Sequence, residues 1–410
     1  MNVITALAIC IGKLIARASQ LTNLGAGGTW PGEIALRLSP NILSSLASRL
    51  KKGVILVAGT NGKTTTAKMI QIILEQNGNS VVHNASGANL DNGIVSALIQ
   101  KPQADWGVFE VDENTLPVVL RQVTPKIIVL LNLFRDQLDR YGEVDVIAEK
   151  WQKALKKLPK GCTIIANADD PLVAHLGKAA SSRPGLELRA FGIDEPKLFQ
   201  KKIDHATDST FCLNCGARLK YEGVYFSHIG IWSCPKCGEK RPKPDVSEGN
   251  SPLPGLYNLY NTLASLSVAK TLKIRADLSR FRPAFGRQEE IGNIKLFLSK
   301  NPAGFNQSLR TVLELGAKQL LLVLNDRIPD GRDVSWIWDV DFEMIPNDVS
   351  VRVSGDRVYD LALRLKYAGV KATLYEHLDE ALETPEILYV LPTYSAMLEV
   401  RNILKGRKIL

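Results

Sequence analysis

A glycine-rich segment with one lysine is the part of the sequence whose residue types most directly suggest chemistry. Residues 59–66 read Gly-Thr-Asn-Gly-Lys-Thr-Thr-Thr, between an apolar run at 54–58 that predicts a buried strand and a predicted helix at 64–76. In such a strand–loop–helix unit, backbone N–H groups, the helix N-terminus and the Lys63 ammonium together bind phosphate oxygens. We therefore expect a phosphate-binding loop. It is a variant of the P-loop, because Val57 stands where the usual spacing has its first glycine.

Two oxygen-bearing side chains near this loop suggest a magnesium site. Thr64 follows the lysine directly, and Glu110 lies at the end of a second predicted strand at 106–111. Mg²⁺ prefers hard oxygen ligands, and the carboxyl ends of parallel strands meet at one edge of a sheet. A single acidic residue is more often a surface charge, but the position of Glu110 relative to the loop predicts a nucleotide-bound Mg²⁺ here.

Four of the six cysteines form two C-x-x-C pairs, Cys212 with Cys215 and Cys234 with Cys237, which are separated by 18 residues. This spacing predicts a structural zinc ion, because four thiolates leave no open coordination position for catalysis. Basic residues nearby also permit nucleic-acid binding, but a stabilising zinc-ribbon insertion at 208–241 is the simpler interpretation. Only two isolated thiols remain, which fits a reducing compartment.

The elements that would position these groups alternate between strand and helix, which predicts a parallel sheet covered on both faces. The expected fold class is α/β. A central P-loop ATPase domain at 51–285 contains the cysteine insertion, and a C-terminal Rossmann-like α/β domain at 286–410 follows it. An N-terminal helical segment at 1–50 precedes both. Further strands are predicted at 81–82, 127–131, 163–166, 294–298, 319–324, 351–353 and 387–390, and further helices at 42–50, 144–158 and 258–272.

The composition fits a globular protein of two or three domains, with 45% hydrophobic and 23% charged residues among 410. The net charge of +9 is compatible with an anionic ligand or surface without identifying one. The apolar stretch at 3–16 contains Lys13, has no basic segment before it and is short for a membrane span. We expect a helix that packs on the body of the protein or lies at a membrane surface.

The segment at 58–66, Ala-Gly-Thr-Asn-Gly-Lys-Thr-Thr-Thr, resembles the Mur ligase family. Mur ligases activate a carboxylate with ATP as an acyl phosphate, which an amine then attacks. The resemblance implies that Lys63 and Glu110 take part in catalysis and that Thr64 and Glu110 bind Mg²⁺. The residues that it implies for ATP binding in the loop are Gly59, Thr60, Asn61, Gly62, Lys63, Thr64 and Thr65.

Other matches to this family extend over most of the chain. Asn167 and Asp169 match a loop near the nucleotide, Asn258 and Asn261 match the adenine-contacting motif, and Arg287 matches an arginine at the start of the last domain.

A further match concerns a second metal ion. Asn132, Asp136 and Asp139 match the family's N-x-x-x-D-H-x-D segment, but Gln137 replaces the histidine that helps to bind a second metal in many members.

The segment at 324–343 is the most distinctive part of the C-terminal region, with two tryptophans and several carboxylates after a predicted strand. Together with 300–307, 136–140 and the cysteine insertion, it resembles the MurT family, the Mur ligase-like synthetase subunits of lipid II isoglutaminyl synthases. The resemblance implies ATP-dependent amidation of the D-glutamate α-carboxylate of lipid II to D-isoglutamine. It also implies a cytoplasmic location, with the substrate at the inner face of the membrane.

The same resemblance implies a partner protein. Ammonia would come from a GatD-type glutaminase subunit, and an aspartate from the last MurT domain would complete the Cys–His pair of that partner. Asp333 is the first candidate for this aspartate and Asp339 the second. The residues themselves agree, because the two isolated thiols lie in apolar sequence and no Cys–His motif of a free-standing glutaminase is evident.

Two other functions are open at this point. A Mur or folylpolyglutamate-type ligase that adds an amino acid would use the same loop, although the 324–343 segment, the cysteine insertion and Gln137 argue against it. A zinc-ribbon ATPase that binds nucleic acid would show salt-sensitive binding to DNA or RNA. Its basic excess is modest and its aromatic residues are not interleaved with a basic stripe, so nucleic acid is not the expected partner.

Overall fold

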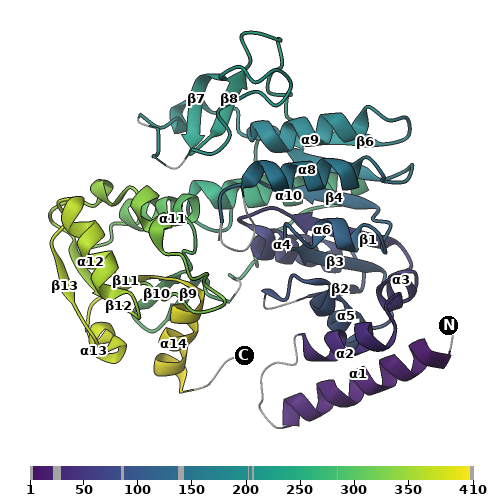
Figure 1. Cartoon of the computed structure of the whole chain (residues 1–410), viewed down its shortest axis with the longest axis horizontal. Coiled ribbons are helices and arrows are strands. Elements are labelled where there is room, and N and C mark those ends of the chain that lie inside the picture. The colour runs from purple at the N-terminus through teal and green to yellow at the C-terminus, as the bar shows by residue number, and fades with distance from the viewer. Residues whose placement is uncertain are drawn as a thin grey trace.

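The computed structural model describes residues 3–21, 29–84, 87–136, 143–201, 203–205, 207–283 and 285–406. Gln137 and Asp139 lie outside these residues. Figure 1 shows a larger central body, a small lobe formed by the cysteine insertion, and a second α/β body at the C-terminal end.

The central body is built on six parallel strands in the order β2-β3-β1-β4-β5-β6, as the alternating pattern predicts. The strand that precedes the glycine-rich loop is in the middle of this sheet, so its carboxyl end has neighbours on both sides. The strands are β1 (Gly53–Ala58), β2 (Val81–His83), β3 (Trp106–Val111), β4 (Ile127–Leu130), β5 (Thr163–Asn167) and β6 (Glu187–Phe191).

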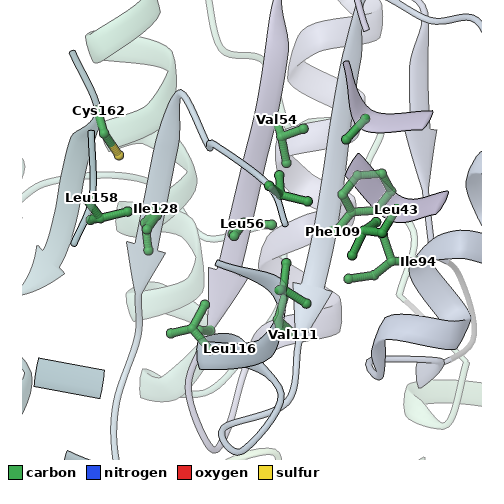
Figure 2. Packing of buried hydrophobic residues seen from close by; sticks show 14 of the residues in the cluster. Leu43, Val54, Leu56, Ile94, Phe109, Val111, Leu116, Ile128, Leu158 and Cys162 are labelled. Atoms are coloured by element: carbon green, nitrogen blue, oxygen red, sulfur yellow. The ribbon is translucent and has the colours of Figure 1, made fainter. Parts of the chain in front are cut away.

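Helices cover both faces of the sheet, because the strands are apolar on both sides. Ile55 and Val57 of β1 pack toward α4 (Lys63–Gln76) and α10 (Leu256–Leu272). Val54 and Leu56 pack on the other face (Figure 2). The helices of that face are α3 (Ile42–Ala47), α5 (Asp91–Gln100), α6 (Leu116–Val119), α8 (Val144–Leu155) and α9 (Pro171–Ser181).

The N-terminal segment adds an outer layer to this second face. Helix α1 (Val3–Leu21) packs on α2 (Trp30–Leu38), and both contact α5. Ala8, Ile9 and Ala35 belong to the same hydrophobic core as the strands. Pro31 occupies the first turn of α2, where its missing N–H costs no hydrogen bond. Among the described residues, no helix combines the length and the apolar character needed to cross a membrane.

The cysteine insertion follows the short helix η2 (Pro196–Leu198) and contains an antiparallel hairpin of β7 (Lys220–Phe226) and β8 (Ile229–Ser233). Ser227 in its two-residue turn has a positive φ of 50°, and its backbone N–H donates to Asp204 Oδ2 at 2.9 Å. Trp232 of β8 donates its indole N–H to the Ala168 carbonyl at 3.0 Å, which ties the hairpin to the central body.

The C-terminal body contains a second six-stranded sheet in the order β13-β12-β11-β14-β10-β9. All pairs are parallel except β9 with β10. The strands are β9 (Arg287–Ile291), β10 (Ile294–Phe297), β11 (Gln319–Val323), β12 (Ser350–Ser354), β13 (Ala372–Leu374) and β14 (Leu388–Pro392). The helices are α11 (Pro302–Glu314), η3 (Ser335–Asp339), η4 (Phe342–Met344), α12 (Val358–Tyr367), α13 (Leu378–Leu382) and α14 (Tyr394–Lys405).

Candidate active site

The glycine-rich loop connects the end of β1 to the start of α4, as the sequence predicts. Gly62 has a φ of 89°, in the left-handed region that favours glycine, and a Cβ atom there would lie 2.1 Å from Asn261 Oδ1. Lys63 is the first residue of α4, and Thr64 and Thr65 follow it as buried residues of the first turn. The loop is therefore a close-packed turn at the N-terminus of a 14-residue helix, which is the arrangement that binds phosphates.

The Lys63 side chain bends back over this loop. Its ammonium donates to the carbonyl oxygens of Gly59 at 2.5 Å and Thr60 at 3.1 Å, and to Glu113 Oε2 at 3.1 Å. Its positive charge is therefore held at the mouth of the loop, where phosphate oxygens would lie.

Asn132, which follows β4, fixes the conformation of the loop. Its side-chain Oδ1 accepts from the Asn61 N–H at 2.8 Å, and its Nδ2 donates to the Asn61 carbonyl at 3.0 Å. The Thr60 N–H donates to the Asn132 carbonyl at 3.0 Å. These bonds hold the loop without using Lys63.

Glu110 and Thr64 meet beside the loop. The Thr64 hydroxyl donates to Glu110 Oε2 at 2.6 Å, whereas Glu110 Oε1 is buried and has no hydrogen-bond partner among the described residues. Asn84 holds the backbone of Glu110 through two hydrogen bonds of 3.0 and 2.9 Å. A buried carboxylate oxygen without a partner is costly unless a cation binds it, so this hard-oxygen pair fits Mg²⁺.

A second charged cluster adjoins Lys63 through Glu113. Lys300, just before α11 of the C-terminal body, forms an ion pair with Asp136, which is buried. Burial raises the pKa of Asp136. Burial also opposes ionisation of Glu113, but the nearby ammonium groups of Lys63 and Lys300 outweigh it and lower the pKa of Glu113. The site thus alternates positive and negative groups around the loop.

The amino end of α11 points at the phosphate-binding loop. Asn301, its N-cap residue, accepts from the Gly304 N–H at 2.8 Å and exchanges amide hydrogen bonds of 3.2 and 3.0 Å with Asn61. The C-terminal body therefore contributes Lys300 and a helix N-terminus, both of which favour anions. Sequence reasoning marked the segment at 300–307 but did not assign this role, because the contact joins residues that are 240 positions apart.

The two residues expected near adenine, Asn258 and Asn261, lie in α10, and Asn261 is next to Gly62 of the loop. Asn261 Oδ1 accepts from the Thr66 hydroxyl at 3.3 Å, and Asn261 Nδ2 donates to Asn258 Oδ1 at 3.2 Å. Arg287, at the start of β9, donates to the Phe285 carbonyl at 3.2 Å, and burial lowers its pKa. Asn261 therefore lies against the loop with Asn258 beside it, and contact of either residue with adenine stays a prediction.

Asn167 and Asp169 make hydrogen bonds within the fold. Asn167 Nδ2 donates to the Leu131 carbonyl at 3.0 Å, and its Oδ1 accepts from the Asp169 N–H at 3.0 Å. Asp169 accepts from Arg241 Nε at 2.6 Å and from the Tyr260 hydroxyl at 2.6 Å. Asp169 therefore joins the central sheet, the insertion and α10, and its role at the nucleotide stays a prediction.

The four paired cysteines gather at one end of the insertion. Their sulfur atoms all lie within 4.8 Å of one another, with Cys212–Cys237 and Cys215–Cys234 distances of 3.6 and 3.5 Å. Tetrahedral zinc with Zn–S bonds of about 2.3 Å requires sulfur atoms about 3.8 Å apart. The cluster therefore has the size of a tetrathiolate zinc site, and zinc as its ion stays a prediction.

The two candidate aspartates of the C-terminal body differ in their surroundings. Asp333 is exposed, and its Oδ1 accepts from the Ser335 N–H at 2.8 Å. Hydrogen bonds from Ser335 lower the pKa of Asp333, so it is a carboxylate. Asp339 forms an ion pair of 3.3 Å with Arg135, which also binds Asp208 at 2.5 Å. Asp333 thus faces outward, whereas Asp339 joins the two bodies.

Comparison with known proteins agrees with this architecture. The Mur ligase middle domain family matches residues 57–269, and the MurT ligase C-terminal family matches residues 298–397. Among solved structures, a pseudomurein peptide ligase type C from Methanothermus fervidus superposes with a TM-score of 0.69 at 21% identity, over 88% of this chain and 80% of that chain. MurF from Acinetobacter baumannii superposes with a TM-score of 0.63 at 15% identity, over 92% of this chain and 80% of that chain. Both show the Mur ligase fold.

Curated relatives match the chain along almost its whole length. The lipid II isoglutaminyl synthase (glutamine-hydrolyzing) subunit MurT of Streptococcus pneumoniae is 34% identical over 97% of both chains. The subunit of the same name from Staphylococcus aureus is 32% identical over 95% of both chains. With both family models matched in order and curated MurT relatives similar along almost the whole chain, this chain belongs to the MurT family of Mur ligase-type ATP-dependent ligases.

Proposed function

We propose that this chain is the ATP-dependent synthetase subunit that amidates the D-glutamate α-carboxylate of lipid II, using ammonia from a GatD-type glutaminase. The similarity to MurT subunits over 97% of the chain carries this proposal. The geometry supports the ATP-dependent half of it, because Lys63, Thr64 and Glu110 surround one loop at the edge of the central sheet.

The proposed reaction has two steps. A carboxylate oxygen of the substrate attacks the γ-phosphorus of ATP, so that an acyl phosphate forms and ADP leaves. Ammonia then attacks the acyl carbon, phosphate leaves with the electron pair of the C–O bond, and the nitrogen loses a proton to give the amide. Bound Mg²⁺ would neutralise charge on the phosphate oxygens.

Each residue of the site has a defined task in this scheme. The backbone of the loop and the Lys63 ammonium bind the β- and γ-phosphates, and Thr64 and Glu110 would hold Mg²⁺. Lys300 and the N-terminus of α11 add positive potential on the side of the C-terminal body. The carboxylate of the substrate is an anion, so the same potential would attract it to the γ-phosphate.

The surroundings of the six cysteines are the reason why we assign the source of ammonia to a partner protein. Cys162 is buried, and burial raises its pKa to about 12, which makes it a poor nucleophile. Cys10 lies on the exposed side of α1, far along the chain from the loop that binds phosphate. The remaining four cysteines form the cluster of the insertion.

Reconstituted synthesis tests the proposal. Purified protein is incubated with ATP, Mg²⁺, lipid II and ammonium chloride, with and without a GatD-type glutaminase and glutamine, and amidated lipid II and ADP are quantified by mass spectrometry. We expect product with ammonia alone, and product from glutamine only when the glutaminase is present. Absence of amidated product at high free ammonia would contradict the proposal.

A loop variant links that activity to the described site. Lys63→Ala removes the charge at the mouth of the loop and should reduce amidation by at least about 100-fold, the usual scale for loss of one preorganised charge partner. The matched control is Lys318→Ala, which removes an exposed lysine whose ion pair, among the residues that the structure describes, is with exposed Asp348, and it should retain activity. Equal activity of both variants would show that the loop is not the site of chemistry.

A further inference from the structure

Helix α1 has two different faces. The inner face, with Ala8 and Ala16 buried and Gly12 close to the Pro31 carbonyl, packs on α2 and α5. On the outer face three large apolar side chains are exposed by more than half. They are Ile4 at 57%, Leu7 at 56% and Leu14 at 64%. With 3.6 residues per turn, positions 4, 7 and 14 form one stripe along the helix.

The charges on α1 fit an anionic surface. The helix contains no acidic residue, and exposed Lys13 and Arg17 lie along one margin of the apolar stripe. Neither basic side chain forms an ion pair with the described acidic residues. Trp30, at the start of α2, is 71% exposed. Apolar side chains bordered by Lys or Arg, with an exposed tryptophan nearby, are typical of helices that lie in the plane of a membrane interface.

The position of α1 in the fold also suits contact with a membrane. Figure 1 shows α1 as the outermost element at the lower edge of the central body, with α2 and α5 between it and the sheet. Asn92 of α5 donates to Glu33 of α2 at 3.1 Å, and the Asp112 N–H donates to the Asn89 carbonyl, just before α5, at 2.9 Å. Asp112 is two residues from Glu110, so the helices beneath α1 reach the edge of the sheet that carries the phosphate site.

We propose that the outer face of α1, together with Trp30, binds the surface of an anionic lipid bilayer and holds the enzyme beside a lipid-linked substrate. The link to the substrate rests on the proposed function, whereas the binding to lipid does not. A single stripe of three side chains is small for a stable protein interface, which buries about 800 Å² on each partner. Interfacial helices, in contrast, need only modest apolar area when basic groups add attraction to anionic lipids.

Vesicle flotation of the full-length protein tests the proposal. Vesicles of phosphatidylglycerol mixed with phosphatidylcholine are compared with vesicles of phosphatidylcholine alone, at low and high salt. We expect preferential binding to the anionic vesicles that weakens with salt. The double variant Leu7→Glu/Leu14→Glu should bind at least about tenfold less, because it replaces apolar area with charge. Lys13→Glu/Arg17→Glu should lose the preference for anionic lipid.

The matched control carries the same substitution elsewhere. Leu315→Glu/Ile403→Glu changes two apolar residues of the C-terminal body, each 43% exposed, and should bind vesicles like the unmodified protein. Circular dichroism confirms that each variant is folded. The proposal is overturned if the unmodified protein does not float, if the α1 variant and the control bind equally, or if sedimentation shows that the stripe holds two copies of the chain together.

An activity comparison separates this inference from the proposed function. The α1 double variant should amidate a water-soluble, short-chain analogue of lipid II at the normal rate with free ammonia, but lose activity on lipid II embedded in vesicles. Loss on both substrates would count against a docking role. If neither protein amidated either substrate while flotation still depended on the stripe, the proposed function would fail and the lipid-binding surface would stand.

Discussion

At the scale of single residues, Glu110 carries the clearest chemical signal in the molecule. One of its oxygens accepts from Thr64, and the other is buried without a partner among the described residues. The sequence predicted this residue from its place at the end of an apolar strand. It could not predict that one oxygen of this carboxylate lacks a hydrogen-bond partner, because that depends on how Asn84 and Thr64 from two other elements contact Glu110.

A conservative substitution tests this oxygen. Glu110→Gln keeps an acceptor for the Thr64 hydroxyl but removes the negative charge, so the Mg²⁺ concentration for half-maximal amidation should rise at least about tenfold. Activity is measured across an Mg²⁺ titration at saturating ATP. Glu290→Gln is the control, because Glu290 is exposed and pairs with Lys295 on the C-terminal sheet. An unchanged Mg²⁺ dependence in Glu110→Gln would exclude it as a ligand.

At the scale of elements, buried strands are the most predictable parts of this chain. The expected strand at 106–111 corresponds to β3 at Trp106–Val111, because every residue of it is buried and the run is apolar except for Glu110. The sequence did not predict β6 or β9. Both are edge strands, and their sequences Glu-Leu-Arg-Ala-Phe and Arg-Gln-Glu-Glu-Ile mix charges with apolar residues. An edge strand tolerates such sequences, so hydrophobicity alone does not identify it.

The cysteine insertion is an element whose stability should depend on a metal ion. Cys212, Cys234 and Trp232 pack in one small cluster with Ala174 of α9, which offers little apolar area of its own. We expect one zinc ion per chain by elemental analysis. Cys234→Ser should lose that zinc and lower the melting temperature by at least about 4 °C, which corresponds to roughly 1–2 kcal/mol for a domain of this size.

The control for the metal is Cys10→Ser, which changes an exposed thiol of α1 and should retain both zinc and stability. A chelator should reproduce the loss in the unmodified protein and have no further effect on Cys234→Ser. Metal-free protein with an unchanged melting temperature would show that the cluster does not depend on an ion.

At the scale of the whole molecule, polar contacts join the C-terminal body to the phosphate-binding loop. Lys300 pairs with Asp136, and Asn301 bonds to Asn61, over sequence separations of 164 and 240 residues. The sequence around either residue of these two pairs does not identify the residue that it contacts. Sequence patterns therefore predicted two α/β bodies but not the surface on which they meet, and that surface places positive charge from one body at the loop of the other.

The two candidate aspartates permit the last test, which concerns communication with the proposed glutaminase partner. Asp333 is an exposed carboxylate, whereas Asp339 is paired with Arg135, so Asp333 is the better placed to orient a histidine of a glutaminase. Asp333→Asn should reduce glutamine-dependent amidation by at least about 100-fold, since an asparagine cannot stabilise the imidazolium, and spare ammonia-dependent amidation.

Asp339→Asn is the matched control and should retain both activities. Binding of the glutaminase, measured by calorimetry, must be unchanged for the comparison to report on catalysis. Loss of glutamine-dependent activity in Asp339→Asn alone would transfer the role to that residue. Equal loss of both activities in Asp333→Asn would exclude Asp333 as a residue that acts on the partner, because ammonia-driven synthesis does not use the glutaminase.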